Sequence, residues 1–231
     1  MGANAERAGF NRAATMQKAV ALTFDADMTP NMLRDLKSGK VASWYNEAVI
    51  TILRRERVPA TLFLTGLWIE TYPATTRNLS ADPLFELGNH SYSHGGFRSP
   101  CYGLSVTRES NKTAKVQKTD ALLEKHTTTF RKYFRFTGLC FDADDVKNVE
   151  AQGYTVIGGD VLGGDGFERS PAKIALGVVG HVRPGSIVIL HMHGGPNAPR
   201  TANALSEIIE KLRARGYTFA KVSDLLKLHS K

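Results

Sequence analysis

The chain has 231 residues, of which 42% are hydrophobic and 21 are glycines, and this size fits one globular domain rather than two. Its formal net charge of +8 electrostatically favours an anionic partner, such as a cell-wall surface or an acidic glycan. The basic residues are dispersed and accompany no zinc-finger, helix-turn-helix or RNA-binding motif, so we expect no nucleic-acid partner.

The hydropathy pattern predicts no membrane span, because no run of about eighteen apolar residues occurs. Residues 1–17 are polar and lack the apolar central run of a signal peptide. We therefore expect a polar N-terminal leader over residues 1–17, followed by one folded domain over residues 18–228.

Short apolar runs alternate with helical patterns from residue 18 onward. The run KAVALTFDA (18–26) predicts a buried strand that ends at carboxylates, whereas residues 41–57 have apolar side chains at helical spacing until Pro59 stops the helix. This alternation argues for βαβ units and an α/β fold with a parallel sheet, open or closed into a barrel. Further apolar runs lie at 60–66, 84–94, 133–138, 154–160 and 186–193, and further helical patterns at 106–130, 174–179 and 201–215.

Polar side chains end four of these apolar runs, and in parallel α/β folds such groups meet beyond the carboxyl ends of the strands. His90 and His94 stand in H-S-Y-S-H, a spacing that puts two imidazoles on one side of a helical turn, within reach of one metal ion. A neighbouring carboxylate would complete a metal site, and the alternative is a pair of solvated or capping histidines. The polar residues at the run ends are Asp25, Asp27, His90, His94, Arg135, His191 and His193.

The segments LTFDADM and GNHSYSH resemble the first two motifs of the polysaccharide deacetylases, carbohydrate esterase family 4. The resemblance runs in order over about residues 18–228. In the first family motif, T-F-D-D-G, the first aspartate is the general base and the second binds the metal, which implies the base role for Asp25. The second motif supplies both metal-binding histidines, here His90 and His94.

The segments YFRFTG and SIVILH resemble the third and fifth motifs of the same family. The arginine of the third motif, R-x-P-Y-G, holds the base aspartate, so that role falls to Arg135. The leucine and histidine of the fifth motif supply an apolar pocket wall and the general acid, which implies these roles for Leu190 and His191. In a continued strand His193 would face the same side as His191, to share the acid role, contact substrate or be only a polar neighbour.

Three departures from the family motifs leave roles open. The chain reads Asp25-Ala26-Asp27 where the family has adjacent aspartates, so we expect Asp27 as the metal ligand if the pair lies in a loop, the alternative being a loop-capping aspartate. Thr137 replaces the proline of the third motif and Gly138 follows it, in a groove-lining loop whose backbone N–H helps to hold the oxyanion of the substrate in the family, so this change leaves that role open for Thr137 and Gly138.

The third departure is the fourth motif, an aspartate and tryptophan region in the family. Here GGDVLGGDGF offers Asp160 and Asp165 and no tryptophan. We expect one of them to orient His191, and the alternative is that both are turn aspartates.

Cys101 and Cys140 are the two cysteines of the chain. They follow the second and third motif segments, on loops that the resemblance makes neighbours at the active face. We predict a disulfide between them, which suits an oxidising compartment, with two buried free thiols as the alternative.

The resemblance implies a distorted (β/α) barrel of about seven parallel strands and a divalent metal. The expected metal is zinc, and the alternatives are cobalt or another transition metal. The expected activity is hydrolysis of N-acetyl groups on a chitin-oligosaccharide or peptidoglycan type of carbohydrate, with water activated by the metal. The alternatives are an O-acetyl xylan esterase, another amide hydrolase with this fold, or a glycan-binding homologue without turnover. We expect an extracellular, periplasmic or cell-wall location, with a cytoplasmic one as the alternative, and a monomer rather than an oligomer.

Overall fold

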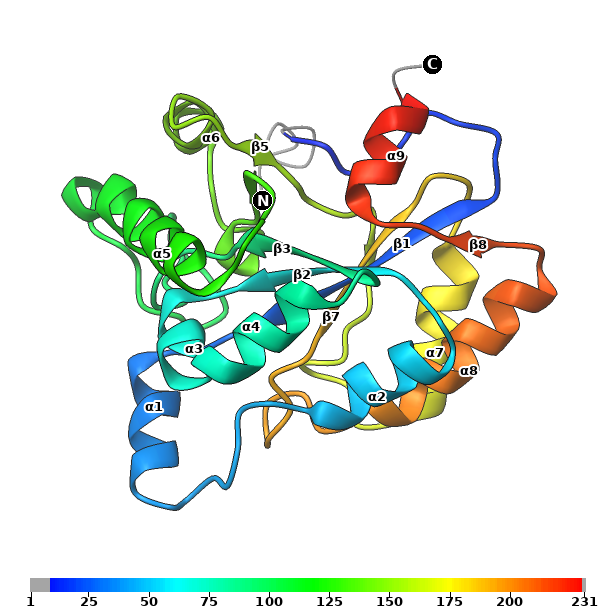
Figure 1. Ribbon diagram of the computed structural model, residues 1–231, viewed down its shortest axis with the longest axis horizontal. Coiled ribbons are helices and arrows are strands. Elements are labelled where there is room, and N and C mark those ends of the chain that lie inside the picture. Colours follow the sequence, from blue (N-terminus) through cyan, green and yellow to red (C-terminus); the bar gives the residue numbers. More distant parts are fainter. Residues whose placement is uncertain (1–8, 230–231) are drawn as a thin grey trace.

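A curled parallel sheet forms the centre of the protein. The computed structural model describes residues 9–229, so residues 1–8 of the expected leader lie outside the described part. The strands are β1 (Ala19–Ala26), β2 (Ala60–Leu64), β3 (Phe85–Asn89), β4 (Tyr133–Phe134), β5 (Thr155–Val156), β6 (Val161–Leu162), β7 (Ile187–His191) and β8 (Thr218–Phe219). Seven of them follow the order β5-β4-β3-β2-β1-β7-β6 with parallel neighbours, and β8 pairs with β1 (Figure 1). The predicted distorted barrel of seven parallel strands is confirmed as a curled half-barrel.

The central strand β1 is buried along all eight of its residues. Successive side chains of a strand point to opposite faces of the sheet. Val20, Leu22 and Phe24 accordingly pack into the large core beneath the helices, whereas Ala19 and Ala21 face the barrel interior. The interior side of β1 therefore begins apolar, and its next two positions toward the carboxyl end are polar.

Helices cover the outer face of the sheet, and the last of them packs on the inner side, where Val222 and Leu225 join the cluster of Ala19 and Ala21. They are α1 (Pro30–Lys37), α2 (Glu47–Arg55), α3 (Gly66–Thr71), α4 (Pro73–Ala81), α5 (Lys112–His126), α6 (Ala143–Glu150), α7 (Pro171–His181), α8 (Thr201–Ala214) and α9 (Val222–His229). Helix α8 contacts both α2 and α7, whereas α3, α4 and α5 contact one another in a second group (Figure 1). Within the described residues, none of the helices combines the length and the apolarity that crossing a membrane requires.

The expected helix over 41–57 begins only at Glu47. Residues 41–46 form a loop instead, because the Trp44 side chain is buried rather than aligned with a helix face. Its indole Nε1 donates a hydrogen bond to the Met32 carbonyl at 2.7 Å, and its backbone N–H donates to the Tyr72 hydroxyl at 2.8 Å. These bonds hold the loop against the carboxyl end of the sheet.

Residues 9–17 run across the open side of the half-barrel. Phe10 forms a parallel bridge with Ile157, just after β5, and Arg12 forms an antiparallel bridge with Ser186, just before β7. Ala13, the residue after Arg12, is fully buried. The described part of the expected leader thus packs against the domain that follows it.

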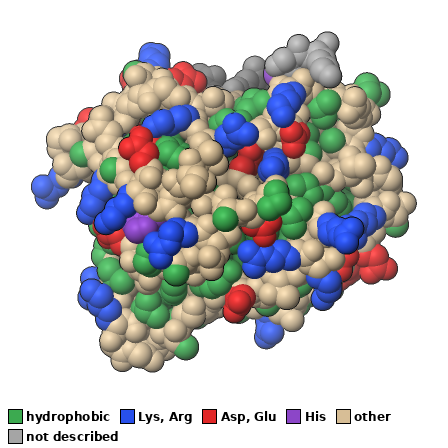
Figure 2. All heavy atoms as spheres, viewed as in Figure 1, with side chains coloured by type: hydrophobic (Ala, Val, Ile, Leu, Met, Phe, Trp, Pro, Cys, Tyr) green, Lys and Arg blue, Asp and Glu red, His purple; other side chains and the backbone are tan. Residues whose placement is uncertain are grey.

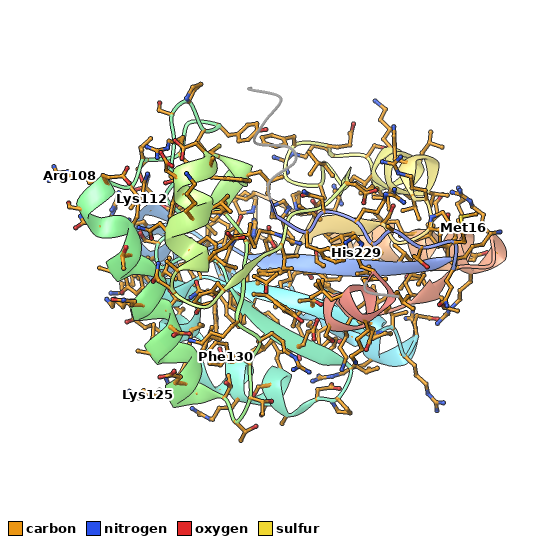
Figure 3. All side chains as sticks on the ribbon, turned by 90° about the horizontal axis from the view of Figure 1, so that it is seen from above. Met16, Arg108, Lys112, Lys125, Phe130 and His229 are labelled. Atoms are coloured by element: carbon orange, nitrogen blue, oxygen red, sulfur yellow. A yellow bond between two sulfur atoms is a disulfide. The ribbon has the colours of Figure 1, made fainter. Side chains whose placement is uncertain are left out.

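The last described helix, α9, lies beside this N-terminal segment. The backbone N–H of Ala14 donates to the Nδ1 atom of His229 at 3.0 Å. Figure 3 shows His229 on the same side of the molecule as Met16, whose side chain projects into solvent. The Lys and Arg side chains are spread over the face in Figure 2 rather than gathered into one patch, in agreement with their dispersal along the sequence.

Candidate active site

Asp25 and Asp27 lie at the carboxyl end of β1 and face the same way. Asp25 is the penultimate residue of β1 and Asp27 follows its last residue, so the expectation of a loop holds only for Asp27. Residues two apart in extended backbone point to one side. Both carboxylates accordingly approach one imidazole, since His90 Nε2 is 3.7 Å from Asp25 Oδ2 and 3.4 Å from Asp27 Oδ1.

Arg135 follows β4, is fully buried and holds Asp25 in place. Its Nη1 donates to Asp25 Oδ1 at 2.8 Å and to the Thr23 hydroxyl at 2.7 Å, and its Nη2 donates to the Gly158 carbonyl at 3.0 Å. The guanidinium lies over the Phe63 ring, 4.0 Å from the centroid. Burial lowers the pKa of Arg135, and the charge and hydrogen bond of Asp25 oppose that shift. The structure therefore contains the expected contact between Arg135 and Asp25.

His90 and His94 lie on the irregular loop after β3 and not on the expected helical turn. Ser91 and His94 have positive φ angles of 63° and 52°, which a right-handed helix does not allow. The two rings nevertheless converge, with centroids 5.2 Å apart. His90 Nδ1 donates to the Arg135 carbonyl at 2.8 Å, so its Nε2 presents a lone pair toward the two carboxylates.

Asp27, His90 and His94, called here the metal trio, offer ligand atoms that all lie within 4.8 Å of one another. Two ligand atoms that are each about 2.1 Å from a cation lie about 3.0–3.4 Å apart. Asp27 Oδ2 lies 3.1 Å from His94 Nε2, and Asp27 Oδ1 lies 3.4 Å from His90 Nε2. Asp27 Oδ1 is buried and has no hydrogen-bond partner among the described residues, which a bound cation would remedy. The trio therefore fits a divalent cation.

The charge state of Asp27 also suits a metal ligand. Burial raises the pKa of this carboxyl, but His94, His193 and His90 outweigh burial and hold the pKa well below its usual range. Asp27 is thus ionised at neutral pH, as a metal-binding carboxylate must be.

His191, the last residue of β7, approaches the metal trio through its Nε2, which lies 3.9 Å from Asp27 Oδ2. Its ring Nδ1 donates to Asp165 Oδ1 at 2.8 Å and its backbone N–H donates to Asp165 Oδ2 at 2.9 Å. The Thr201 hydroxyl donates to the same carboxylate at 2.5 Å. Burial lowers the pKa of His191, but the charge and hydrogen bond of Asp165 outweigh burial and raise it to about 10. Asp165 is therefore the aspartate that contacts His191.

Two residues that we expected in the site lie outside it. Asp160 accepts hydrogen bonds from the Ile187 backbone N–H at 2.9 Å and the Ser186 hydroxyl at 3.0 Å, at the amino end of β7, so its assignment to the catalytic group is wrong. Leu190 is fully buried in the core beneath the helices, so its assignment as a pocket wall is also wrong. The alternation of β7 turns Ile189 toward the cleft instead.

The site opens into a cleft of about 1160 Å³. Gly138 and His193 line this cleft, whereas Thr137 is buried behind its surface. Two aromatic residues that sequence reasoning misses, Tyr102 and Phe167, also line it. These residues are 57% and 74% exposed, and their ring centroids lie 5.7 Å apart. Each stands beside a glycine in a loop, a local signal for an exposed tip.

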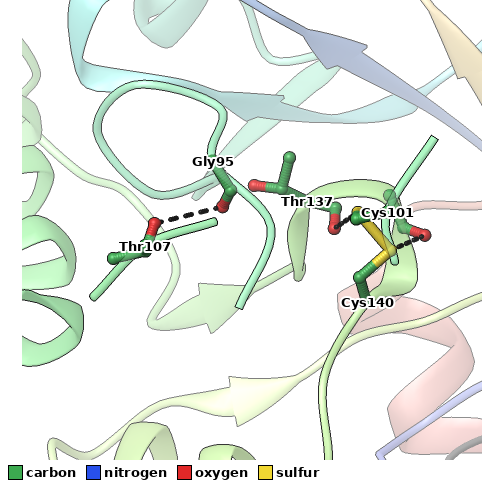
Figure 4. Close-up of a disulfide and its surroundings, with 6 residues drawn as sticks. Gly95, Cys101, Thr107, Thr137 and Cys140 are labelled. Carbon is green, nitrogen blue, oxygen red and sulfur yellow. Dashed lines mark hydrogen bonds between the residues drawn. A yellow bond between two sulfur atoms is a disulfide. The ribbon is translucent and has the colours of Figure 1, made fainter. Parts of the chain in front are cut away.

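A disulfide between Cys101 and Cys140 joins the two loops on one side of the cleft (Figure 4). Their Cα atoms lie 5.8 Å apart, so the predicted bridge is confirmed and the alternative of two free thiols is wrong. Gly138 lies beside the bridge with a φ of 59°, and a Cβ at this position would lie 2.9 Å from the Cys101 sulfur. The bridge therefore fixes the wall of the cleft next to Tyr102.

The model of the family described as polysaccharide deacetylase matches residues 12–157, more than half of the chain. The chain belongs to the polysaccharide deacetylase family. This family member is 26% identical over 187 residues to the uncharacterized protein YlxY of Bacillus subtilis. The aligned region covers 79% of the chain and 53% of that protein. The chain thus spans about half the length of this relative. The chain is also 25% identical over 210 residues to a peptidoglycan-N-acetylglucosamine deacetylase of Bacillus cereus. The aligned region covers 89% of the chain and 67% of that enzyme.

Solved structures of polysaccharide deacetylases share the fold. A peptidoglycan N-acetylglucosamine deacetylase superposes with a TM-score of 0.78 at 22% identity, over 93% of this chain and 91% of that one. A family 4 pseudoenzyme from Bacillus anthracis gives 0.76 at 24% identity, over 94% and 68%. A family 4 acetyl xylan esterase from Clostridium thermocellum, solved with a cobalt ion, gives 0.72 at 28% identity, over 91% of both chains.

Proposed function

We propose that this member of the polysaccharide deacetylase family is a metal-dependent hydrolase that removes N-acetyl groups from a carbohydrate. The observation that carries the proposal is that two fixed pairs, Asp25 with Arg135 and His191 with Asp165, flank the metal trio. A divalent cation supplies Lewis acidity when bound and lowers the pKa of a nearby water. Zinc is the preferred candidate and cobalt the second.

Asp25 is suited to be the general base. Arg135 donates a hydrogen bond to Asp25 Oδ1 at 2.8 Å, while Asp25 Oδ2 faces His90 Nε2 at 3.7 Å. The second oxygen is thus available to accept a proton from the water that attacks the acetyl carbonyl carbon. Arg135 keeps this carboxylate oriented and balances its charge in a buried position.

His191 is suited to be the general acid. Because Asp165 accepts the hydrogen on Nδ1, the second proton of the imidazolium resides on Nε2, which faces the cleft. A pKa raised to about 10 keeps the ring protonated at neutral pH. His191 then donates this proton to the sugar nitrogen as the amide C–N bond breaks, which releases acetate and a free amine.

The substrate class is a further part of the proposal. Tyr102 and Phe167 offer exposed ring faces at the cleft, and such faces suit contact with the apolar face of a sugar ring. The net charge of +8 favours an anionic polymer such as peptidoglycan, and the similarity to a peptidoglycan-N-acetylglucosamine deacetylase agrees. The likeness to an acetyl xylan esterase keeps O-acetyl groups as the second candidate. The disulfide supports an extracellular or cell-wall location.

Acetate release tests the proposal. The protein, loaded with zinc or cobalt, is incubated with acetylated chitooligosaccharide, peptidoglycan and acetylxylan, and acetate is measured. We expect release from an N-acetylated substrate, a loss of activity after chelation, and a decrease of at least about 100-fold for Asp25→Asn. The matched control is Asp144→Asn, which changes an exposed carboxylate and leaves the rate unchanged. Stoichiometric metal without acetate from any of the three substrates would favour a glycan-binding homologue without turnover.

A further inference from the structure

His193 is a buried imidazole at the site to which the proposed mechanism assigns no role. Its side chain is 3% exposed, and its Nδ1 has no hydrogen-bond partner among the described residues. This nitrogen lies 3.5 Å from Asp27 Oδ2, slightly beyond hydrogen-bond distance. Nδ1 is thus a polar atom that is removed from solvent and directed at a carboxylate of the metal trio.

Asp27 lacks the support that a strand gives to its neighbours. The pairing of β1 ends at Ala26, whose carbonyl accepts hydrogen bonds from the Thr65 hydroxyl at 2.9 Å and from the Thr65 backbone N–H at 3.3 Å. Asp27 follows this last tie, and its Oδ1 has no hydrogen-bond partner in the described part of the chain. Metal-binding carboxylates are usually held by a further hydrogen bond from a neighbouring residue, and Asp27 lies beyond the end of the β1 pairing, where the strand does not fix it.

The chain builds a rigid support for the His193 ring. Gly194 and Gly195 follow it with φ angles of 64° and 57°, and a Cβ at Gly195 would lie 2.6 Å from the Trp44 ring. The His193 and Trp44 rings lie 6.4 Å apart between centroids. The Asn46 backbone N–H donates to the carbonyl of the residue before His193 at 2.9 Å. The loop over 41–46 therefore fixes the backbone and the ring of His193 together.

We propose that His193 is the positioning residue of the metal site: its Nδ1–H donates to Asp27 Oδ2 and thereby holds the carboxylate with Oδ1 toward His90 and Oδ2 toward His94. The inference rests on the proposed metal-dependent function. It gives Asp27 a partner two residues past His191, just beyond the end of the strand that neighbours β1. His193 orients a ligand in this role and is neither a ligand nor the acid.

Cobalt binding tests the inference without the need for a substrate. Metal-free protein is titrated with Co²⁺, and affinity and the visible d–d spectrum are recorded for wild type, His193→Ala and His193→Asn. The amide N–H of asparagine can occupy the position of Nδ1–H. We expect His193→Ala to weaken Co²⁺ binding about 10–100-fold, as loss of a hydrogen bond to a ligand does. His193→Asn restores most of that affinity, and the saturated spectrum keeps its band positions in all three proteins.

The controls separate this inference from the proposed function. Absence of Co²⁺ binding in wild type would contradict the metal-dependent function itself. Wild-type affinity in His193→Ala would overturn only the positioning role, as would failure of His193→Asn to restore binding. A changed d–d spectrum at saturation would instead make His193 a direct ligand and overturn the inference. His181→Ala, a change at an exposed histidine of α7, keeps wild-type affinity, and circular dichroism verifies the fold of each variant.

Discussion

Asp165 accepts hydrogen bonds from two nitrogen atoms of His191, the ring Nδ1 at 2.8 Å and the backbone N–H at 2.9 Å. One carboxylate therefore fixes the end of β7 and the rotation of the ring at the same time. The carboxylate is itself fully buried and receives a third hydrogen bond from Thr201, the first residue of α8. The orientation of the proposed acid thus depends on Asp165 and Thr201, neither of which lines the cleft.

Asp165→Asn should move the alkaline limb of the pH–rate profile to lower pH. Asp165 raises the pKa of His191 against the effect of burial, and the acid must be protonated, so activity falls as pH rises through that pKa. The amide removes the negative charge, which lowers the pKa of His191 and depletes the acid at a lower pH. Rates between about pH 6 and 10 measure the shift, and an unchanged limb would mean that another group is the acid.

Arg135→Ala should destabilise the protein strongly. The variant leaves the carboxylate of Asp25 buried without its cationic partner, and loss of one member of a buried pair costs about 3–5 kcal/mol. Urea unfolding measures the free energy of unfolding. The double variant Asp25→Leu, Arg135→Met removes both charges and should recover part of this loss, whereas Arg55→Ala, at an exposed position, changes little. A loss below about 1 kcal/mol in the single variant would contradict this account.

Ile189→Ala and Leu190→Ala should differ in what they change. Leu190 is fully buried beneath the helices, so its truncation should cost about 2–5 kcal/mol of stability and leave KM near the wild-type value. Ile189 lines the cleft, so its truncation should raise KM up to about tenfold with a smaller loss of stability. Kinetics and thermal unfolding of both variants test the assignment, and a KM increase confined to Leu190→Ala would reverse it.

Loss of the disulfide should destabilise the fold and loosen the cleft. Cys101 and Cys140 are 39 residues apart in the sequence, and a bridge that closes a loop of this length typically stabilises by about 2–4 kcal/mol. The double variant Cys101→Ser, Cys140→Ser should unfold at lower guanidinium concentration and bind oligosaccharides more weakly, because Tyr102 follows the bridge. The unreduced wild-type protein should have no titratable thiol, and two reactive thiols would contradict the bridge.

The sequence allows the half-barrel to be predicted because its strands are short apolar runs separated by helical patterns. The sequence is a weaker guide to short helices whose start is marked by a capping residue. Thr29 and Asp142 accept hydrogen bonds from the first-turn N–H groups of α1 and α6, and these capping residues are visible in the sequence, yet sequence reasoning misses both helices. The H-S-Y-S-H spacing wrongly predicts a helical turn, because the positive φ of Ser91 is set by the fold and not by the residue type.

In the site, the errors differ in kind. Leu190 could have been excluded from sequence, because a strand that turns His191 toward the cleft turns the preceding residue away. The choice between Asp160 and Asp165 could not have been made, since both stand among glycines that give no side-chain direction. The approach of His193 to Asp27 depends on the Trp44 loop, which belongs to a distant segment that the helical spacing of residues 41–57 concealed.

The N-terminal segment determines where a shortened form of this protein can begin. Phe10 exchanges backbone hydrogen bonds with Val156 at 2.8 Å and Gly158 at 3.0 Å, and the Ala13 N–H donates to the Gly185 carbonyl at 2.9 Å. A chain trimmed to residue 18 would leave these groups beside β5 and β7 open to pairing with another molecule, which is a route to aggregation. Recombinant forms intended for crystallisation or immobilisation should therefore keep the chain from residue 9 onward.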